Sequence, residues 1–189
     1  MKRREDALAL LYEYTRTDSL RKHARSVEAV LRHFARKLGE PEDLWGLAGL
    51  LHDFDYERHP SPDEHPMVGC AILEQQGYPQ EVIRAILGHA EYTGTPRDSN
   101  LARYLFACDE LTGLITAVAL VRPNQSIHEV EVKSVRKKLK DKSFARTVNR
   151  DDVRKGIEEL GVDPDAFISE VIGALREVAE EIGLSGRRE

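Results

Sequence analysis

The sequence predicts an all-α protein, and three observations support this fold class. Apolar residues recur three and four positions apart along the whole chain, which is the spacing of one helix face. No segment alternates cleanly between apolar and polar residues, as a half-buried strand would. Breaks in the helical pattern coincide with Gly39, Gly77 and Pro123, residue types that end helices.

The first half of the chain contains five predicted helices. The second has the clearest ends, because Thr17, Asp18 or Ser19 can cap its start and Gly39 follows its last apolar residue. Residues 53–64 contain two prolines and predict a loop. The predicted helices are residues 5–14, 20–38, 41 or 42 to 52, 65 or 66 to 77, and 79–89.

The second half begins with the most apolar segment of the chain. Residues 99–121 follow a loop at 93–97 and predict one long helix, which we expect at the centre of the fold. Pro123 ends it. The remaining predicted helices are residues 127–140, 151–160 and 165–182, followed by a frayed tail at 187–189.

Composition and charge exclude several classes of protein. With 41% hydrophobic and 32% charged residues, the chain is neither collagen-like nor wholly disordered, and 189 residues suit one domain. No apolar run approaches the roughly 20 residues that cross a bilayer, and no apolar stretch follows Met1. We therefore expect a cytoplasmic protein with no membrane contact. A net charge of -5 argues against nucleic-acid binding over the whole surface.

The two cysteines, Cys70 and Cys108, lie far apart inside apolar helical patterns and form no CxxC motif. This spacing supports neither a disulfide framework nor a zinc knuckle. We predict two buried, reduced thiols.

Ionisable side chains fall on apolar helix faces. His23, His89 and Asp109 each lie three or four positions from apolar residues, and therefore on an apolar helix face. His52 and Asp53 follow directly after an apolar run. A single histidine in such a place is more often a hydrogen-bonded core residue than a ligand. Asp109 favours the ligand interpretation, because a buried carboxylate costs free energy unless it is paired with a cation. The helix face that carries Asp109 contains no Lys or Arg. We expect a cation to meet this carboxylate.

Neutral imidazoles and carboxylates without cysteine suit a divalent metal at a catalytic site rather than a structural zinc site. The candidate ions are Mn, Fe, Co, Ni, Zn or Mg. In such a site a metal acts as a Lewis acid and lowers the pKa of bound water toward about 7.

The order His23, His52, Asp53 and Asp109 resembles the H…HD…D pattern of the HD-domain superfamily of metal-dependent phosphohydrolases. The resemblance covers residues 20–123 and implies that these four residues bind a first metal. Members with two metals have two further histidines in between, and His65 and His89 match those positions. The segments LHDFDYE at 51–57 and DELTGLI at 109–115 are similar to those of small bacterial HD hydrolases. One compact domain at residues 1–189 is then expected, with a metal-binding helical bundle at 20–123 and a C-terminal helical extension at 124–189.

The resemblance implies hydrolysis of a small phosphorylated substrate, with a nucleotide expected by analogy. Asp53 would bridge the two ions in a two-metal site. Related nucleotidases often carry a catalytic Glu three residues after the HD aspartate, where this chain has Tyr56. Asp55 and Glu57 flank that position and are candidates to orient the water or protonate the leaving oxygen. The alternative is that both are solvated loop acids.

A phosphorylated substrate also needs cationic side chains. Candidates are Arg97, in the loop after His89, and the basic cluster containing Lys133, Arg136 and Lys137. The alternatives for this cluster are a solvated basic face and nucleic-acid contact, although the cluster lacks the interleaved aromatic residues that stack on bases.

Two other functions stay open at this point. The same order of histidines and aspartates permits a diiron enzyme that activates dioxygen. The departure from the related nucleotidases at Tyr56 permits a nucleotide-binding regulatory module without turnover. The sequence also leaves open the substrate, the number of ions, and whether the helices after Pro123 cover the site or form a homodimer.

Overall fold

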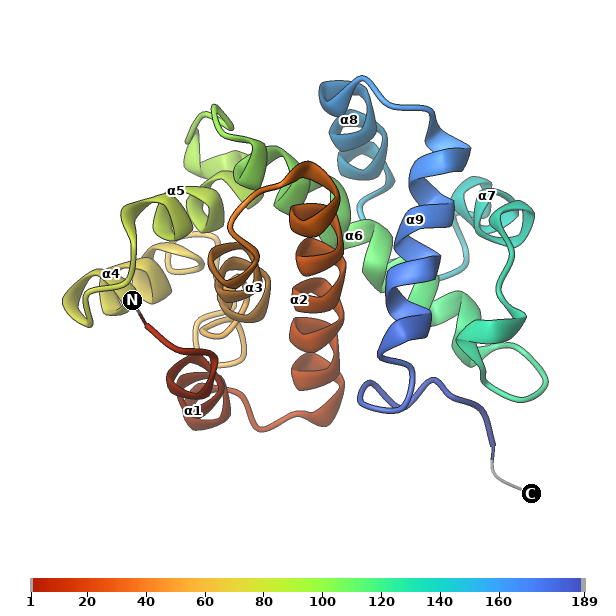
Figure 1. The fold of residues 1–189 in the computed structure, drawn as a ribbon, viewed down its shortest axis with the longest axis horizontal. Helices are drawn as coiled ribbons and strands as arrows, with labels where there is room; N and C mark the ends of the chain where they lie inside the picture. Colours follow the sequence, from red (N-terminus) through yellow and green to blue (C-terminus); the bar gives the residue numbers. More distant parts are fainter. Residues whose placement is uncertain (1, 188–189) are drawn as a thin grey trace. The chain divides into compact units, whose positions relative to one another are not determined.

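The structure is a computed structural model that describes residues 2–187 (Figure 1). Within these residues it is 66% helical and contains no strand, which confirms the all-α prediction. The helices are α1 (Arg4–Tyr14), α2 (Asp18–Leu38), α3 (Glu42–Leu51), α4 (Met67–Gln75), α5 (Gln80–His89), α6 (Asn100–Leu120), α7 (Val132–Lys140), α8 (Arg150–Leu160) and α9 (Pro164–Glu177), with short 3-10 helices η1 (Glu91–Thr93) and η2 (Ile127–Glu129).

The chain divides into two compact units, Met1–Phe106 and Ala107–Glu189. The first contains α1 to α5, η1 and the start of α6. The second contains the rest of α6, η2 and α7 to α9. The division therefore falls inside one continuous helix. The predicted single domain at residues 1–189 stays a prediction.

Helix α3 is the core of the first unit. Every residue from Leu44 to Leu51 is buried, and the helix contacts α1, α2 and α5. A helix that is apolar all round is stable only when other elements surround it. Its most extensive contact is with α2, which runs beside it (Figure 1).

The close packing of α2 on α3 depends on Gly49. A Cβ atom added there would lie 2.8 Å from the backbone nitrogen and Cα of Glu28 on α2. Real Cβ atoms essentially never come so near, so no larger residue fits without a shift of one helix.

A buried carboxylate ties α1 to α2. Glu28 is 3% exposed and accepts hydrogen bonds from Arg4 Nε at 2.6 Å and from Arg32 Nε at 3.0 Å. Charges are buried at acceptable cost only when they are paired in this way. The ion pair between Arg4 and Glu28 thus holds α1 against α2, the helix that carries His23.

The second unit differs from the sequence prediction at two places. The prediction of one continuous helix at 127–140 is wrong. Val130 and Glu131 have an extended backbone and separate η2 from α7. The carbonyl of Val130 accepts a hydrogen bond from Arg176 Nη2 at 2.9 Å, and its side chain is fully buried. A contact with a residue on α9 thus replaces the helical hydrogen bond of this carbonyl.

The last predicted helix, residues 165–182, is longer than the observed one. Helix α9 ends at Glu177, and a series of turns continues to Gly183. Ala179, Ile182 and Leu184 are buried, so the apolar pattern persists although the backbone leaves the helix. The backbone N–H of Ile127 then donates to the carbonyl of Leu184 at 2.9 Å, which fixes this segment against η2.

Other sequence predictions agree with the structure. Helix α2 ends at Leu38 before Gly39, and residues 53–64 contain no helix. Cys70 and Cys108 are free and buried, as predicted. Burial and the nearby Asp55 raise the pKa of the Cys70 thiol to about 12. No helix among residues 2–187 has the length and apolar character needed to cross a membrane.

Candidate metal centre

The predicted ligands lie mostly at helix ends. His52 and Asp53 follow directly after α3, His65 lies two residues before α4, and His89 is the last residue of α5. His23 lies within α2 and Asp109 within α6. Helix ends are fixed by the packing of the whole helix and still place a side chain beside a turn, which suits a site that needs both rigidity and access.

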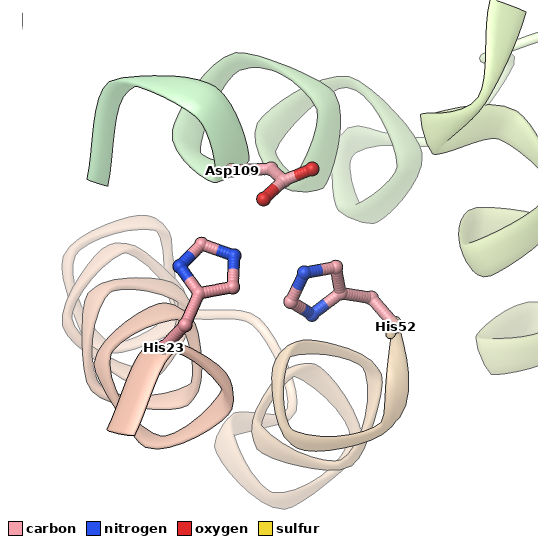
Figure 2. A group of neighbouring side chains, drawn as sticks. All are labelled: His23, His52 and Asp109. Atoms are coloured by element: carbon pink, nitrogen blue, oxygen red, sulfur yellow. The ribbon is translucent and has the colours of Figure 1, made fainter. Parts of the chain in front are cut away.

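A first cluster consists of His23, His52 and Asp109, whose side chains point toward one another (Figure 2). Each offers one ligand atom, and these atoms all lie within 4.8 Å of one another. The rings of His23 and His52 meet edge to face with centroids 5.2 Å apart. His52 is fully buried, whereas the other two residues are half-buried.

A second cluster consists of Asp53, His65 and His89, again with ligand atoms within 4.8 Å of one another. Asp53 Oδ1 lies 3.2 Å from His65 Nε2 and 3.4 Å from His89 Nε2. Both imidazoles therefore present the same ring nitrogen to one carboxylate oxygen.

Asp53 also faces the first cluster. Its other oxygen, Oδ2, lies 3.5 Å from His52 Nε2. The two oxygens of the Asp53 carboxylate thus face two separate groups of ligands. This is the arrangement in which a carboxylate can be shared between two cations. The Asp53 side chain is 24% exposed.

The hydrogen bonds of the imidazoles fit a metal site. Nδ1 of His52 lies 2.8 Å from the carbonyl oxygen of Gly49, and Nδ1 of His65 lies 2.8 Å from Asp55 Oδ1. Nδ1 of His89 contacts the carbonyl oxygen of Ile86. Because these oxygens only accept, each Nδ1 carries a proton, and the lone pair of a neutral ring is then on Nε2. Metal-binding histidines are oriented in this way. The residues present thus fit a divalent metal.

Asp53 and Asp55 favour positive charge at His65, which is a second proton on the imidazole when no metal is bound and which a bound metal would displace. Burial by itself would lower the pKa of His65, but hydrogen bonds to Asp53 and Asp55 raise it to about 9. Burial would raise the pKa of Asp53, but His52, His65 and His89 hold that pKa well below its usual range. Asp53 is therefore ionised at neutral pH and available to a positive ion.

The three predicted catalytic acids occupy different places. Asp53 lies between the clusters, whereas Asp55 is 1% exposed and lies behind His65. Asp55 Oδ2 accepts from the backbone N–H of Gly69 at 2.8 Å, and a Cβ at Gly69 would come within 2.7 Å of the Asp55 carboxyl carbon. Both carboxylate oxygens of Asp55 therefore hold neighbouring groups in place.

Glu57 lies at the connection between α1 and α2. Its Oε2 accepts from the backbone N–H groups of Arg16 at 2.8 Å and Thr17 at 3.0 Å. The hydrogen bond from Thr17 has the largest effect on the pKa of Glu57 and lowers it; burial opposes this, and the hydrogen bond from Arg16 lowers the pKa further. The carboxylate thus holds the loop before α2.

The predicted substrate-binding cations already have protein partners. Arg97 donates to Glu91 Oε1 at 2.7 Å and to the carbonyl of Gly88 at 3.1 Å, and its guanidinium lies over the ring of Phe106. These contacts hold it within its own loop. Its contact with a phosphate stays a prediction.

The basic cluster predicted around Lys133 lies on α7 in the second unit. Arg136 pairs with Asp165 at 2.8 Å, and Lys133 pairs with Glu131 at 2.7 Å. Lys137 lies on the same helix. A role for these three residues in substrate binding likewise stays a prediction.

Tyr92 was not among the predicted site residues, yet it belongs to the surroundings of the second cluster. Its hydroxyl donates to the carbonyl oxygen of His65 at 2.9 Å. The sequence offers one signal for it, since it follows the ligand His89 by three residues and lies in η1. That spacing alone does not distinguish it from a surface tyrosine.

The sequence was also compared with known proteins. The HD domain family pattern matches residues 20–114. No curated protein and no solved structure matches the chain. The family match covers half of the chain and contains all six residues of the two clusters. The chain therefore belongs to the HD-domain superfamily of metal-dependent phosphohydrolases.

Proposed function

We propose that this protein is a phosphohydrolase that acts on a small phosphate ester, with a nucleotide as the expected substrate class. Family membership and the two His/Asp clusters already indicate a metal-dependent hydrolase. The observation that carries the finer proposal is the position of Asp53 between the clusters, with one oxygen toward His52 and the other toward His65 and His89.

Each cluster would supply the ligands of one ion. His23, His52 and Asp109, with Asp53 Oδ2, would hold one divalent cation, and Asp53 Oδ1 with His65 and His89 would hold a second. When bound, such cations supply Lewis acidity to a phosphoryl oxygen and lower the pKa of water toward about 7.

The other residues position these ligands. Asp55 keeps the proton of His65 on Nδ1, so that Nε2 remains directed at Asp53. The carbonyl groups of Gly49 and Ile86 do the same for His52 and His89. Burial of the imidazoles excludes water from their sides, and the exposed part of Asp53 leaves one direction open to a substrate.

The test is phosphate release from a panel of nucleotides and sugar phosphates by protein supplied with Mn²⁺ or Co²⁺. We expect release from at least one member, and its loss by a factor of about a thousand or more in Asp53→Ala, because removal of the shared ligand disrupts both clusters. Asp98→Ala is the matched control, since Asp98 is exposed, pairs with exposed Arg84 and belongs to neither cluster.

Two results would contradict the proposal. One is phosphate release that is unchanged in Asp53→Ala. The other is a protein that contains two irons per chain, consumes dioxygen with its substrate and releases no phosphate, which would assign it to the diiron oxygenases. Metal analysis of protein purified without added metal distinguishes these cases.

A further inference from the structure

Exposed aromatic rings are few on this protein, and two of them meet at the second cluster. Among residues 2–187 the exposed aromatic side chains are Tyr12, Tyr56 and Tyr92, at 37%, 41% and 55%. The ring of Tyr12 is covered by the guanidinium groups of Arg21 and Arg25. Tyr56 and Tyr92 both contact His65 instead.

Both rings are held in place although they are exposed. Tyr56 meets the imidazole of His65 edge to face, with centroids 5.2 Å apart and an angle of 84° between the ring planes. Tyr92 is fixed at its far end by the hydrogen bond from its hydroxyl to the His65 carbonyl, at 2.9 Å.

A fixed and exposed aromatic ring is suited to binding. Its apolar surface remains in water until a ligand covers it, and little conformational freedom is lost when that happens. Planar aromatic groups stack on such rings with little dependence on their identity. Because His65 Nε2 lies 3.2 Å from Asp53 Oδ1, both tyrosines contact a residue that itself contacts the carboxylate proposed to be shared between the two ions.

We propose that Tyr56 and Tyr92 form an aromatic recognition surface and that the substrate carries a planar aromatic group near its phosphate ester. The inference rests on the proposed function, which supplies the phosphate end of the substrate. The aromatic group is either the base of a nucleotide or an aryl group joined directly to the ester oxygen. Tyr56 and Tyr92 then contribute to the specificity of the site.

The experiment measures binding rather than turnover. Three ligands in which a CH₂ group replaces the ester oxygen are titrated calorimetrically into Mn²⁺-loaded protein: the analogue of adenosine monophosphate, that of ribose 5-phosphate, and benzylphosphonate as the aryl case. We expect at least one aromatic ligand to bind about tenfold or more tightly than the ribose ligand. The adenosine compound and benzylphosphonate distinguish the two sources of the aromatic group.

Substitutions test whether the tyrosines provide this preference. Tyr56→Leu and Tyr92→Leu are expected to reduce the preference about fivefold or more, whereas Tyr56→Phe retains the ring, its contact with His65 and the preference. Tyr92→Phe retains the ring but loses its hydrogen bond to the His65 carbonyl, so a smaller reduction than in Tyr92→Leu is expected. Tyr12→Leu is the matched control and is expected to leave it unchanged. Circular dichroism establishes that each variant is folded.

Several outcomes would overturn the inference. The first is equal affinity for aromatic and ribose ligands in the wild type, and the second is an unchanged preference in both leucine variants. The third is an equal loss of preference in the phenylalanine and leucine variants, which would assign recognition to the hydroxyl groups. Failure of the proposed function looks different. An aromatic preference that depends on the two tyrosines, without hydrolysis of any phosphate ester, leaves the recognition surface in place and removes only the hydrolase assignment.

Discussion

Each buried imidazole in this site uses its two nitrogen atoms for different purposes. Nδ1 of His52 is fixed by a backbone carbonyl, whereas Nδ1 of His65 is fixed by the side chain of Asp55. A carbonyl belongs to the helix and cannot be removed by substitution. The carboxylate of Asp55 can, so His65 is the imidazole whose orientation depends on one replaceable residue.

We predict that Asp55→Asn weakens metal binding at the second cluster by about 10- to 100-fold. The asparagine oxygen can still accept from the N–H of Gly69, but its NH₂ group then faces His65. Since an NH₂ group donates, it favours a proton on Nε2, where the lone pair is needed. Competition titrations with a chelating dye measure the effect.

The control for this prediction is Asp63→Asn, an exposed acid in the loop that precedes His65. It is expected to bind metal like the wild type. Equal metal affinity in Asp55→Asn and the control would show that Asp55 does not position His65.

At the scale of the helix, α3 determines where the first cluster forms. Its residues from Leu44 onward are buried, and His52 and Asp53 follow its last residue. The close approach at Gly49 sets its distance from α2, which carries His23. The ligands of two helices are therefore brought together by helix packing rather than by the ligands themselves.

We predict that Gly49→Ala lowers the free energy of unfolding by about 1 to 3 kcal/mol, because the added methyl group meets the backbone of Glu28 and forces α2 and α3 apart. The same displacement separates His23 from His52, so metal affinity is expected to fall as well. Urea unfolding followed by circular dichroism measures the first effect, and metal titration the second.

Gly173→Ala provides the matched control on α9. A Cβ atom there meets no atom within 4 Å. The alanine is expected to stabilise the protein by about 0.5 to 1 kcal/mol, as glycine is the poorer helix former. A Gly49→Ala protein as stable as the wild type would contradict the close packing of α2 on α3.

At the scale of the whole molecule, the two clusters join parts of the chain that are distant in sequence. Their residues extend from His23 to Asp109 and come from or adjoin α2, α3, α4, α5 and α6. Ions bound at these residues would therefore link most helices of the family region, and such ligands stabilise only the folded state.

We predict that removal of metal by a chelator lowers the melting temperature by about 5 to 10 °C for each bound ion. Each ion at about one hundred times its dissociation constant contributes about 2.7 kcal/mol, and a chain of this length shifts by about 2 to 4 °C per kcal/mol. Calorimetry of apo and reloaded protein measures this shift. Asp53→Asn is expected to lose most of it, and an equal melting temperature with and without metal would contradict binding at the clusters.

Local signals in the sequence predicted the elements whose ends depend on neighbouring residues. Helix α2 ends before Gly39 as predicted, because a cap acts within one turn of the backbone. The break at Val130 was missed, because it depends on a hydrogen bond from Arg176, 46 residues away. Sequence periodicity contains no information about such a partner.

The sequence by itself determined the helical fold class and the order of the six histidines and aspartates, since both depend on spacing along the chain. Only the tertiary structure decided that Asp53 faces both clusters, that Asp55 lies behind His65, and that Tyr92 reaches the same histidine. These arrangements depend on which way a side chain points after distant helices have packed. Neither residue type nor spacing specifies that direction.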